Sequence, residues 1–109
     1  MNIGVDLVAI KKFHKIKAHD YKHWSRVFSM LEWEYAFKDG LSASHLAGIF
    51  AAKEAAMKAT GLVGVENYRK FEVRHDKLGA PKLNLKGSKL SLSHDQGLAI
   101  AFVLASTKK

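Results

Sequence analysis

The segment that most constrains the fold is a run of small and apolar residues, Phe50-Ala-Ala-Lys-Glu-Ala-Ala-Met-Lys-Ala-Thr-Gly61. Ala and Met are strong helix formers, so the run predicts a tightly packing helix. Glu54 and Lys58 stand four residues apart within it and project from one helix face. Charges in such apolar surroundings are either paired with each other or bound to a ligand. The simplest interpretation is an i,i+4 ion pair worth about 0.2–0.5 kcal/mol, and ligand binding is the alternative.

A second unusual carboxylate lies near the start of the chain. The predicted first strand, over residues 2–9, has apolar residues at alternate positions, as the buried face of a strand does: Ile3, Val5 and Leu7. Asp6 falls on the opposite face, and Asp is depleted in strands. It either caps a turn or bonds a neighbouring backbone group, or it meets Glu54 and holds a hard cation. Mg²⁺ suits the last case, because it takes one or two carboxylates and binds substrate phosphates.

The remaining pattern places helices early and strands late. We expect helices over about 11–18, 22–38 and 44–60, and strands over about 68–75, 81–86, 89–94 and 98–105. Ser44 is a candidate cap for the third helix, and Gly61 is a candidate for its end. This order indicates one α+β domain over residues 1–109, with a small antiparallel sheet packed on a long central helix.

Composition limits the class of protein. The 109 residues suffice for one core, and the chain has no cysteine for a disulfide framework, a thiolate nucleophile or a zinc site. No apolar run approaches the roughly 18 residues of a membrane span, and the start does not look like a secretory signal. We therefore expect a cytoplasmic protein that does not bind membranes.

The charge is strongly basic and uneven. The formal net charge is +8, and residues 11–26 contain one acid, Asp20, against six basic residues: Lys11, Lys12, Lys15, Lys17, Lys22 and Arg26. Apolar residues between them recur close to helical spacing, which predicts a basic amphipathic helix. A solvated face is the commonest explanation for such a run. Attraction of an acidic partner, a nucleic acid or a membrane surface is the alternative.

Three blocks, in order, resemble the holo-acyl-carrier-protein synthase family, the small 4′-phosphopantetheinyl transferases. They are Ile3-Gly-Val-Asp-Leu-Val-Ala-Ile10, the Phe50 to Ala59 part of the helical run, and Leu90-Ser-Leu-Ser-His-Asp-Gln-Gly-Leu-Ala-Ile-Ala101. Between them, Phe71-Glu-Val-Arg-His-Asp-Lys-Leu-Gly-Ala-Pro-Lys-Leu83 is similar to the family's strand–turn–strand segment. The resemblance covers nearly the full length and implies the 4′-phosphopantetheinyl transferase fold.

The resemblance implies a reaction and a set of site residues. Asp6 and Glu54 fall on the Mg²⁺-binding carboxylates of the family, and Lys58 falls on a lysine close to the transferred phosphate. His94 and Asp95 fall on a segment that lines the coenzyme A site, so Lys58 and His94 are expected to contact coenzyme A. Family members move phosphopantetheine from coenzyme A to a serine of apo-acyl carrier protein, which supplies fatty-acid synthesis, and release adenosine 3′,5′-bisphosphate.

Some roles stay open at this point. The base that takes the serine proton is either a metal-bound water relaying to Asp6 or Glu54, or one of His94 and Asp95. His94 is also explained as a structural residue where a strand enters the Asp95-Gln-Gly97 hairpin turn. The resemblance further implies a homotrimer with sites built across subunit boundaries. It also implies a carrier-docking surface made of basic residues, here Lys11, Lys12, Lys15, Lys22 and Arg26.

The chain also departs from the family pattern. Ile49 stands where many members have arginine, Lys86-Gly-Ser-Lys89 is a short connection, and Thr60-Gly-Leu-Val-Gly64 replaces a Gly-Thr-Gly sequence. These differences keep a specialised or catalytically silent paralogue among the hypotheses. A basic nucleic-acid-binding module is the rival from another class, although it leaves Asp6 and Glu54 unexplained.

Overall fold

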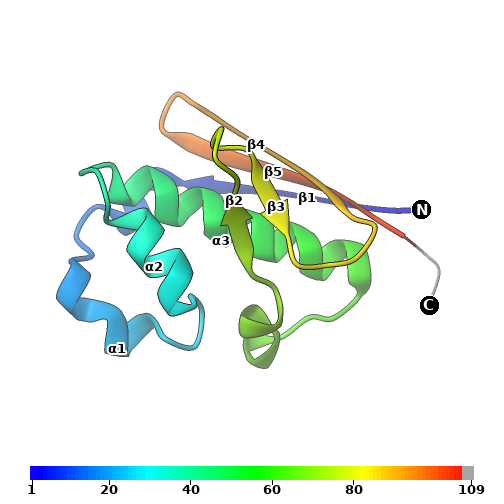
Figure 1. The fold of residues 1–109 in the computed structure, drawn as a ribbon, viewed down its shortest axis with the longest axis horizontal. Coiled ribbons are helices and arrows are strands. Elements are labelled where there is room, and N and C mark those ends of the chain that lie inside the picture. The colour runs from blue at the N-terminus through cyan, green and yellow to red at the C-terminus, as the bar shows by residue number, and fades with distance from the viewer. Residues whose placement is uncertain (107–109) are drawn as a thin grey trace.

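The structure, a computed structural model, describes residues 1–106 and confirms the predicted α+β fold (Figure 1). Strands β1 (Asn2–Ala9), β5 (Leu98–Ala105) and β4 (Lys89–Asp95) form an antiparallel sheet in the order β1-β5-β4. Helix α3 (Ser42–Thr60) crosses one face of this sheet, and α1 (Tyr21–Trp24) and α2 (Met30–Ala36) lie near its N-terminal half. The short strands β2 (Val73–His75) and β3 (Pro81–Leu83) form a separate antiparallel pair. Short 3-10 helices span Ile10–Phe13, Ala18–Asp20 and Val65–Lys70.

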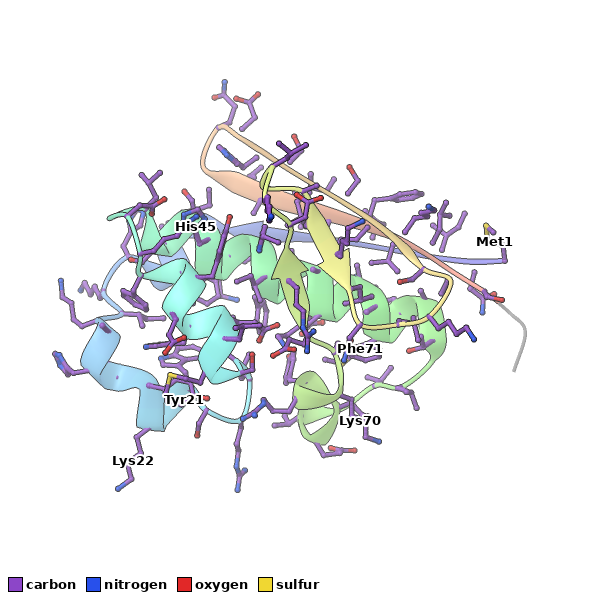
Figure 2. All side chains as sticks on the ribbon, viewed as in Figure 1. Met1, Tyr21, Lys22, His45, Lys70 and Phe71 are labelled. Atoms are coloured by element: carbon purple, nitrogen blue, oxygen red, sulfur yellow. The ribbon has the colours of Figure 1, made fainter. Side chains whose placement is uncertain are left out.

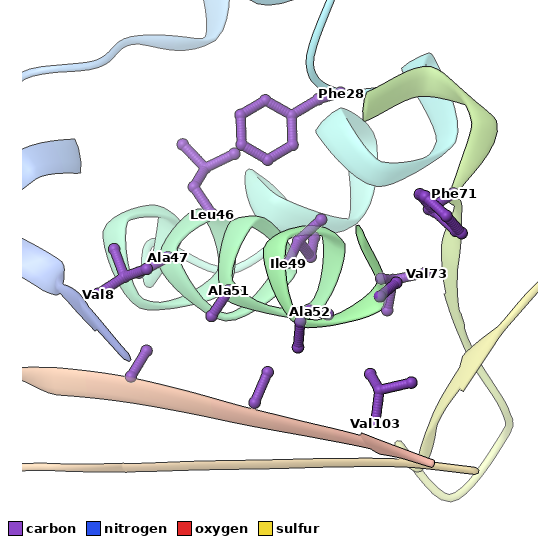
Figure 3. Close-up of a cluster of buried hydrophobic side chains, with 14 of the residues drawn as sticks. Val8, Phe28, Leu46, Ala47, Ile49, Ala51, Ala52, Phe71, Val73 and Val103 are labelled. Carbon is purple, nitrogen blue, oxygen red and sulfur yellow. The ribbon is translucent and has the colours of Figure 1, made fainter. Parts of the chain in front are cut away.

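Alanines let α3 lie very close to the sheet. Its buried face includes Ala51, Ala52 and Ala55, and Val103 of β5 lies opposite (Figure 3). Gly4 of β1 makes the closest approach, because a Cβ there would stand 1.9 Å from the carbonyl oxygen of Ala55. A residue larger than glycine would push the first strand away from the helix. Gly4 therefore sets the distance between the two elements that carry Asp6 and Glu54.

The C-terminal end of α3 agrees with the prediction, and its N-terminal end does not. The helix begins at Ser42 after Leu41, with no side-chain cap, so Ser44 lies inside the helix and the predicted cap is wrong. Gly61 ends the helix as predicted, with a φ of 78° and an N–H that donates to the Met57 carbonyl at 2.8 Å. Glycine adopts this left-handed conformation without the steric cost of a Cβ.

The face of β1 that is buried is the reverse of the predicted one. Gly4 and Val8 face α3, whereas the apolar residues Ile3, Val5 and Leu7 are 60%, 46% and 58% exposed. The side chains of β1 do alternate between two faces. The face that meets the helix is the one that carries Gly4, because only a residue without a Cβ allows the strand to lie so close to Ala55. The outward residues join Ile100 and Phe102 of β5 in one apolar outer face of the sheet.

The basic segment is not the long amphipathic helix that its spacing predicts. Residues 10–13 form one 3-10 turn, and the helix expected over 22–38 is divided into α1 and α2. Ser29 causes this division, because its side chain accepts the Glu32 N–H at 3.2 Å while Glu32 accepts the Ser29 N–H at 2.8 Å. This reciprocal capping box starts a new helix at Met30.

Aromatic packing explains why the segment is folded into short turns. Phe13, Trp24 and Phe28 pack against one another with ring centroids 5.9–6.4 Å apart, and Trp33 adds to the cluster 5.8 Å from Phe28. The Trp33 indole N–H also donates to the Ala18 carbonyl at 2.9 Å. Burial of these rings outweighs helix propensity here, and both tryptophans are packing residues, as expected.

The first part of the strand predicted over 68–75 is not formed, and a buried ion pair binds the backbone there instead. Lys53 of α3 lies 2.9 Å from Glu32 of α2, and both side chains have no exposed surface. The Lys53 ammonium donates to the carbonyls of Tyr68 and Phe71, and Glu32 accepts the Val73 N–H at 2.7 Å. Lys53 thereby takes two carbonyls that a strand over this part of the chain would need. The residues before β2 therefore form the 3-10 helix Val65–Lys70, and only Val73–His75 is strand.

Candidate active site

Asp6 and Lys58 meet where β1 crosses α3. The Lys58 ammonium lies 3.1 Å from Asp6 Oδ1 and donates to the Val5 carbonyl at 3.0 Å. Asp6 is mostly shielded, with its side chain 16% exposed, while that of Lys58 is 54% exposed. In residues 1–106 no ion pair within 4.0 Å joins Lys58 to Glu54, so the i,i+4 interpretation is wrong. The ammonium instead reaches the strand and stays open to solvent.

Glu54 has a different partner. The phenol of Tyr68, in the 3-10 helix Val65–Lys70, donates a hydrogen bond to Glu54 Oε2. Burial, this hydrogen bond and then the charges of Glu54 and Asp6 raise the pKa of Tyr68. The phenol therefore keeps its proton at neutral pH and acts as a donor. Tyr68 is thus joined to Glu54 by a hydrogen bond, and the charge of Asp6 acts on the same hydroxyl.

The donor set of this site fits a cation that needs few protein ligands. No cluster of three or more His, Cys, Asp or Glu side chains able to hold a metal ion occurs in residues 1–106. That count excludes a closed protein cage, whereas Mg²⁺ is commonly held by one or two carboxylates with waters and substrate phosphates. Asp6 and Glu54 carry carboxylate oxygens, the hard donor atoms that such a cation prefers.

His94 and Asp95 lie elsewhere in the chain. Both are exposed at the end of β4, where Gln96 and Gly97 turn the hairpin with φ values of 54° and 75°. They line a shallow hollow with Leu7 of β1 and with residues of β5. The predicted hairpin is present, but no hydrogen bond or ion pair within residues 1–106 joins these two side chains to Asp6, Glu54 or Lys58. Within one chain the predicted site residues therefore form two separate groups.

The basic residues predicted to bind a partner are all exposed: Lys11, Lys12, Lys15, Lys22 and Arg26. They lie on the turns and on α1 that wrap the aromatic cluster, and Figure 2 shows Lys22 pointing away from the protein. Arg26 borders a cleft with Glu66 and Arg69, and Arg69 donates to the Ser25 carbonyl at 2.6 Å. The five basic residues therefore form a positively charged surface on short turns and α1, and not on the long helix that was predicted.

Two residues at the site were missed by sequence reasoning. Gly4 stands within the first block, but only the contact with Ala55 reveals that it sets the spacing between β1 and α3. Tyr68 comes fourteen residues after Glu54, in a segment expected to be a strand. No sequence spacing connects it to the helix.

The sequence profile of the 4′-phosphopantetheinyl transferase superfamily matches residues 2–103. Holo-[acyl-carrier-protein] synthase from Caldicellulosiruptor saccharolyticus is 34% identical over 121 residues, covering 99% of this chain and 98% of that protein. The chain belongs to the holo-acyl-carrier-protein synthase family of 4′-phosphopantetheinyl transferases. The corresponding synthase from Geotalea daltonii is 37% identical, with 93% and 94% of the two chains covered.

Solved structures of this synthase family share the fold. Helicobacter pylori holo-[acyl-carrier-protein] synthase in complex with coenzyme A superposes with a TM-score of 0.80 at 32% identity, over 95% of this chain and 99% of that one. The Chronobacterium ammoniagenes synthase–coenzyme A complex gives 0.75 at 33% identity, over 94% and 93%. The family membership and enzyme class predicted from the ordered sequence blocks are thereby confirmed.

Proposed function

We propose that this protein transfers the 4′-phosphopantetheine arm of coenzyme A to a serine of an apo-acyl carrier protein. The observation that carries the proposal is the meeting of Asp6 and Lys58 at the crossing of β1 and α3, with Glu54 one turn before Lys58 on the helix. Relatives with the same fold hold coenzyme A in their solved structures. The product would be holo-acyl carrier protein for fatty-acid synthesis in the cytoplasm.

The reaction forms one bond and breaks one. The serine hydroxyl oxygen attacks the phosphorus next to pantetheine, and the bond from that phosphorus to the bridging oxygen breaks. Adenosine 3′,5′-bisphosphate leaves with the bridging oxygen. Phosphoryl transfer depends mostly on positioning and on stabilising charge, which suits a site made of two carboxylates and one ammonium.

Lys58 is the positively charged side chain of the proposed site. Its half-exposed ammonium stands at the edge of the site, where it would neutralise a phosphate oxygen as charge develops on the leaving group. Asp6 holds the ammonium at 3.1 Å in the meantime. The serine proton needs an acceptor within hydrogen-bond reach, and the candidates remain a water that relays the proton to Asp6 or Glu54, or one of His94 and Asp95.

Asp6 and Glu54 are the proposed ligands of Mg²⁺. When bound, the ion would neutralise charge on the pyrophosphate of coenzyme A. The part that the chain itself plays is to hold two carboxylates at a fixed spacing, through the close contact of Gly4 with Ala55. Lys58 and Tyr68 each engage one oxygen of these carboxylates, Asp6 Oδ1 and Glu54 Oε2.

We also propose that the exposed basic residues dock the acyl carrier protein. Lys11, Lys12 and Lys15 follow β1, whose Asp6 is part of the site, and Lys22 and Arg26 extend the positive surface. An acidic partner would be steered toward this surface by long-range attraction, which salt weakens. The surface continues to the cleft beside Arg26 and Arg69.

The apolar outer face of the sheet is the proposed contact between copies of the chain in a homotrimer. Six of its residues are 39% to 60% exposed: Ile3, Val5, Leu7, Leu98, Ile100 and Phe102. Apolar patches of this kind on a folded domain mark interaction surfaces. Assembly through this face would bring His94 and Asp95, which border it, toward the site of a neighbouring copy. That arrangement would unite the two groups of predicted site residues.

Replacement of Glu54 tests the proposed site. We expect Glu54→Gln to lower the rate of adenosine 3′,5′-bisphosphate release by about 10²-fold or more, because a charged ligand is lost. The rate is measured by chromatography with coenzyme A, Mg²⁺ and apo-acyl carrier protein. The exposed substitution Glu34→Gln on α2 is the matched control and should leave the rate unchanged. An unchanged rate in Glu54→Gln would remove Glu54 from the site.

A further inference from the structure

Tyr68 is held against α3 by its ring as well as by its hydroxyl. The ring stacks on Phe50, with centroids 5.4 Å apart and planes at 27°, and Phe50 lies one helical turn before Glu54. The hydroxyl then donates to Glu54 Oε2. Ring and hydroxyl therefore fix the direction from which the hydrogen bond reaches the carboxylate.

The backbone of Tyr68 is also anchored. Its carbonyl accepts a hydrogen bond from Lys53 at 3.0 Å, and Lys53 is the residue before Glu54 on α3. Lys53 is in turn paired with Glu32, and both side chains are fully buried. The 3-10 helix that carries Tyr68 therefore cannot shift along α3 without breaking its hydrogen bond to a buried ammonium that is held by Glu32.

This anchoring leaves one oxygen of Glu54 for a ligand. Tyr68 engages Oε2, and no hydrogen bond or ion pair within residues 1–106 engages Oε1. We propose that Tyr68 is a positioning residue that holds Glu54 in one rotamer and presents Oε1 alone to the divalent cation. Mg²⁺ demands near-ideal octahedral geometry, so a carboxylate fixed to bind through one oxygen is a better ligand than a freely rotating one. This inference rests on the proposed function, in which Glu54 is a metal ligand.

The test is the affinity for Mn²⁺, used as a spectroscopic substitute for Mg²⁺. Free Mn²⁺ is measured by electron paramagnetic resonance in the presence of the full-length protein and coenzyme A, after subtraction of Mn²⁺ bound by coenzyme A alone. Tyr68→Phe keeps the ring and its stack on Phe50, so the fold is retained while the hydroxyl is lost. We expect the dissociation constant to rise by about 10- to 100-fold, as for other groups that orient a metal ligand.

Tyr21→Phe is the matched control, because it also removes a phenol that makes a hydrogen bond, here to the Phe28 carbonyl at 3.0 Å. It should bind Mn²⁺ as the parent does. Equal affinities of Tyr68→Phe and the parent would overturn the positioning role, and so would equal weakening in both tyrosine variants.

A third variant separates this inference from the proposed function. Glu54→Gln should lose Mn²⁺ binding at the site if Glu54 is a ligand. Loss in Glu54→Gln with none in Tyr68→Phe refutes the role of Tyr68 only. Unchanged binding in Glu54→Gln refutes the metal site itself, and the positioning role with it.

Discussion

Lys58 reaches from α3 to β1 and lies 3.1 Å from Asp6, although Glu54 stands one turn earlier on the same helix. The choice of partner matters, because it distributes the charges of the site over two elements. One carboxylate is matched by an ammonium and the other by the phenol of Tyr68. Within residues 1–106, Lys58 is the only ion-pair partner of Asp6, and Glu54 has no ion-pair partner. The two carboxylates together therefore keep negative charge that a cation could neutralise.

Removal of the ammonium should affect catalysis more than stability. Lys58→Gln is expected to lower kcat/KM for phosphopantetheine transfer by about 10²- to 10³-fold, because one charge that stabilises the transition state is lost. Stability in urea should change by no more than about 1 kcal/mol, since exposed ion pairs contribute little. Lys82→Gln, on the exposed side of β3, is the control for loss of one positive charge. Transfer at the parental rate by Lys58→Gln would show that the ammonium is not needed.

Replacement of Lys53 should affect stability directly. Lys53→Met leaves the fully buried carboxylate of Glu32 without its cation, which typically costs about 3–5 kcal/mol in the free energy of unfolding. Urea denaturation measures this cost, and the exposed substitution Lys70→Met is the control. The double variant Glu32→Leu with Lys53→Met should remain less stable than the parent. The N–H groups of Ser29 and Val73 lose their acceptor in it, at about 1–3 kcal/mol each. A double variant as stable as the parent would contradict this account.

The ring of His75 predicts a dependence of stability on pH. It stacks on Tyr35 at 3.7 Å, and burial, followed by the nearby His45 and Lys38, lowers the pKa of His75. In the unfolded chain His75 binds a proton near pH 6.5, whereas in the folded chain it binds this proton only at lower pH. The free energy of unfolding therefore falls as the pH drops through about 6.5. His75→Phe keeps a ring for the stack but cannot titrate. Its unfolding free energy should fall less than that of the parent between about pH 7.5 and 5.5, and equal falls would show that His75 does not contribute.

The outer face of the sheet should control assembly. Phe102→Asp places a charge within this apolar face and is expected to give a smaller species than the parent in size-exclusion chromatography with light scattering. Its circular dichroism should stay that of a folded protein, because Phe102 is 40% exposed in the single chain. Leu78→Asp is the control, since Leu78 is 96% exposed in the turn between β2 and β3. The trimer proposal fails if the parent itself is a monomer.

The sequence predicted the architecture better than the details of its first third. The alanine-rich run, the glycine at its end and the hairpin at Asp95 all rest on local preferences, and the structure contains each of them. The division of 22–38 depends on the capping box of Ser29 and Glu32. The conformation of the segment before β2 depends on Lys53, which donates to the carbonyl of Tyr68 fifteen residues later. Local patterns could not predict a contact over this distance in the sequence.

The site shows the same limit. One alternative drawn from the sequence placed Asp6 against the helix that carries Glu54, and the position of Asp6 beside α3 follows from Gly4 fitting against Ala55. The choice of partners, Lys58 for Asp6 and Tyr68 for Glu54, depends on three-dimensional distances that no spacing encodes. The buried face of β1 was predicted in reverse, because apolar alternation does not show which of the two faces of a strand meets the core.

Intact-mass analysis of apo-acyl carrier protein is the most direct test of the central claim. The carrier is incubated with this protein, coenzyme A and Mg²⁺, and a parallel sample contains a chelator. The account predicts a mass gain of one phosphopantetheine that disappears with the chelator. No gain with several carrier proteins, from protein shown to be folded, would contradict the proposed transfer. A gain that survives complete removal of divalent cations would contradict the metal site formed by Asp6 and Glu54.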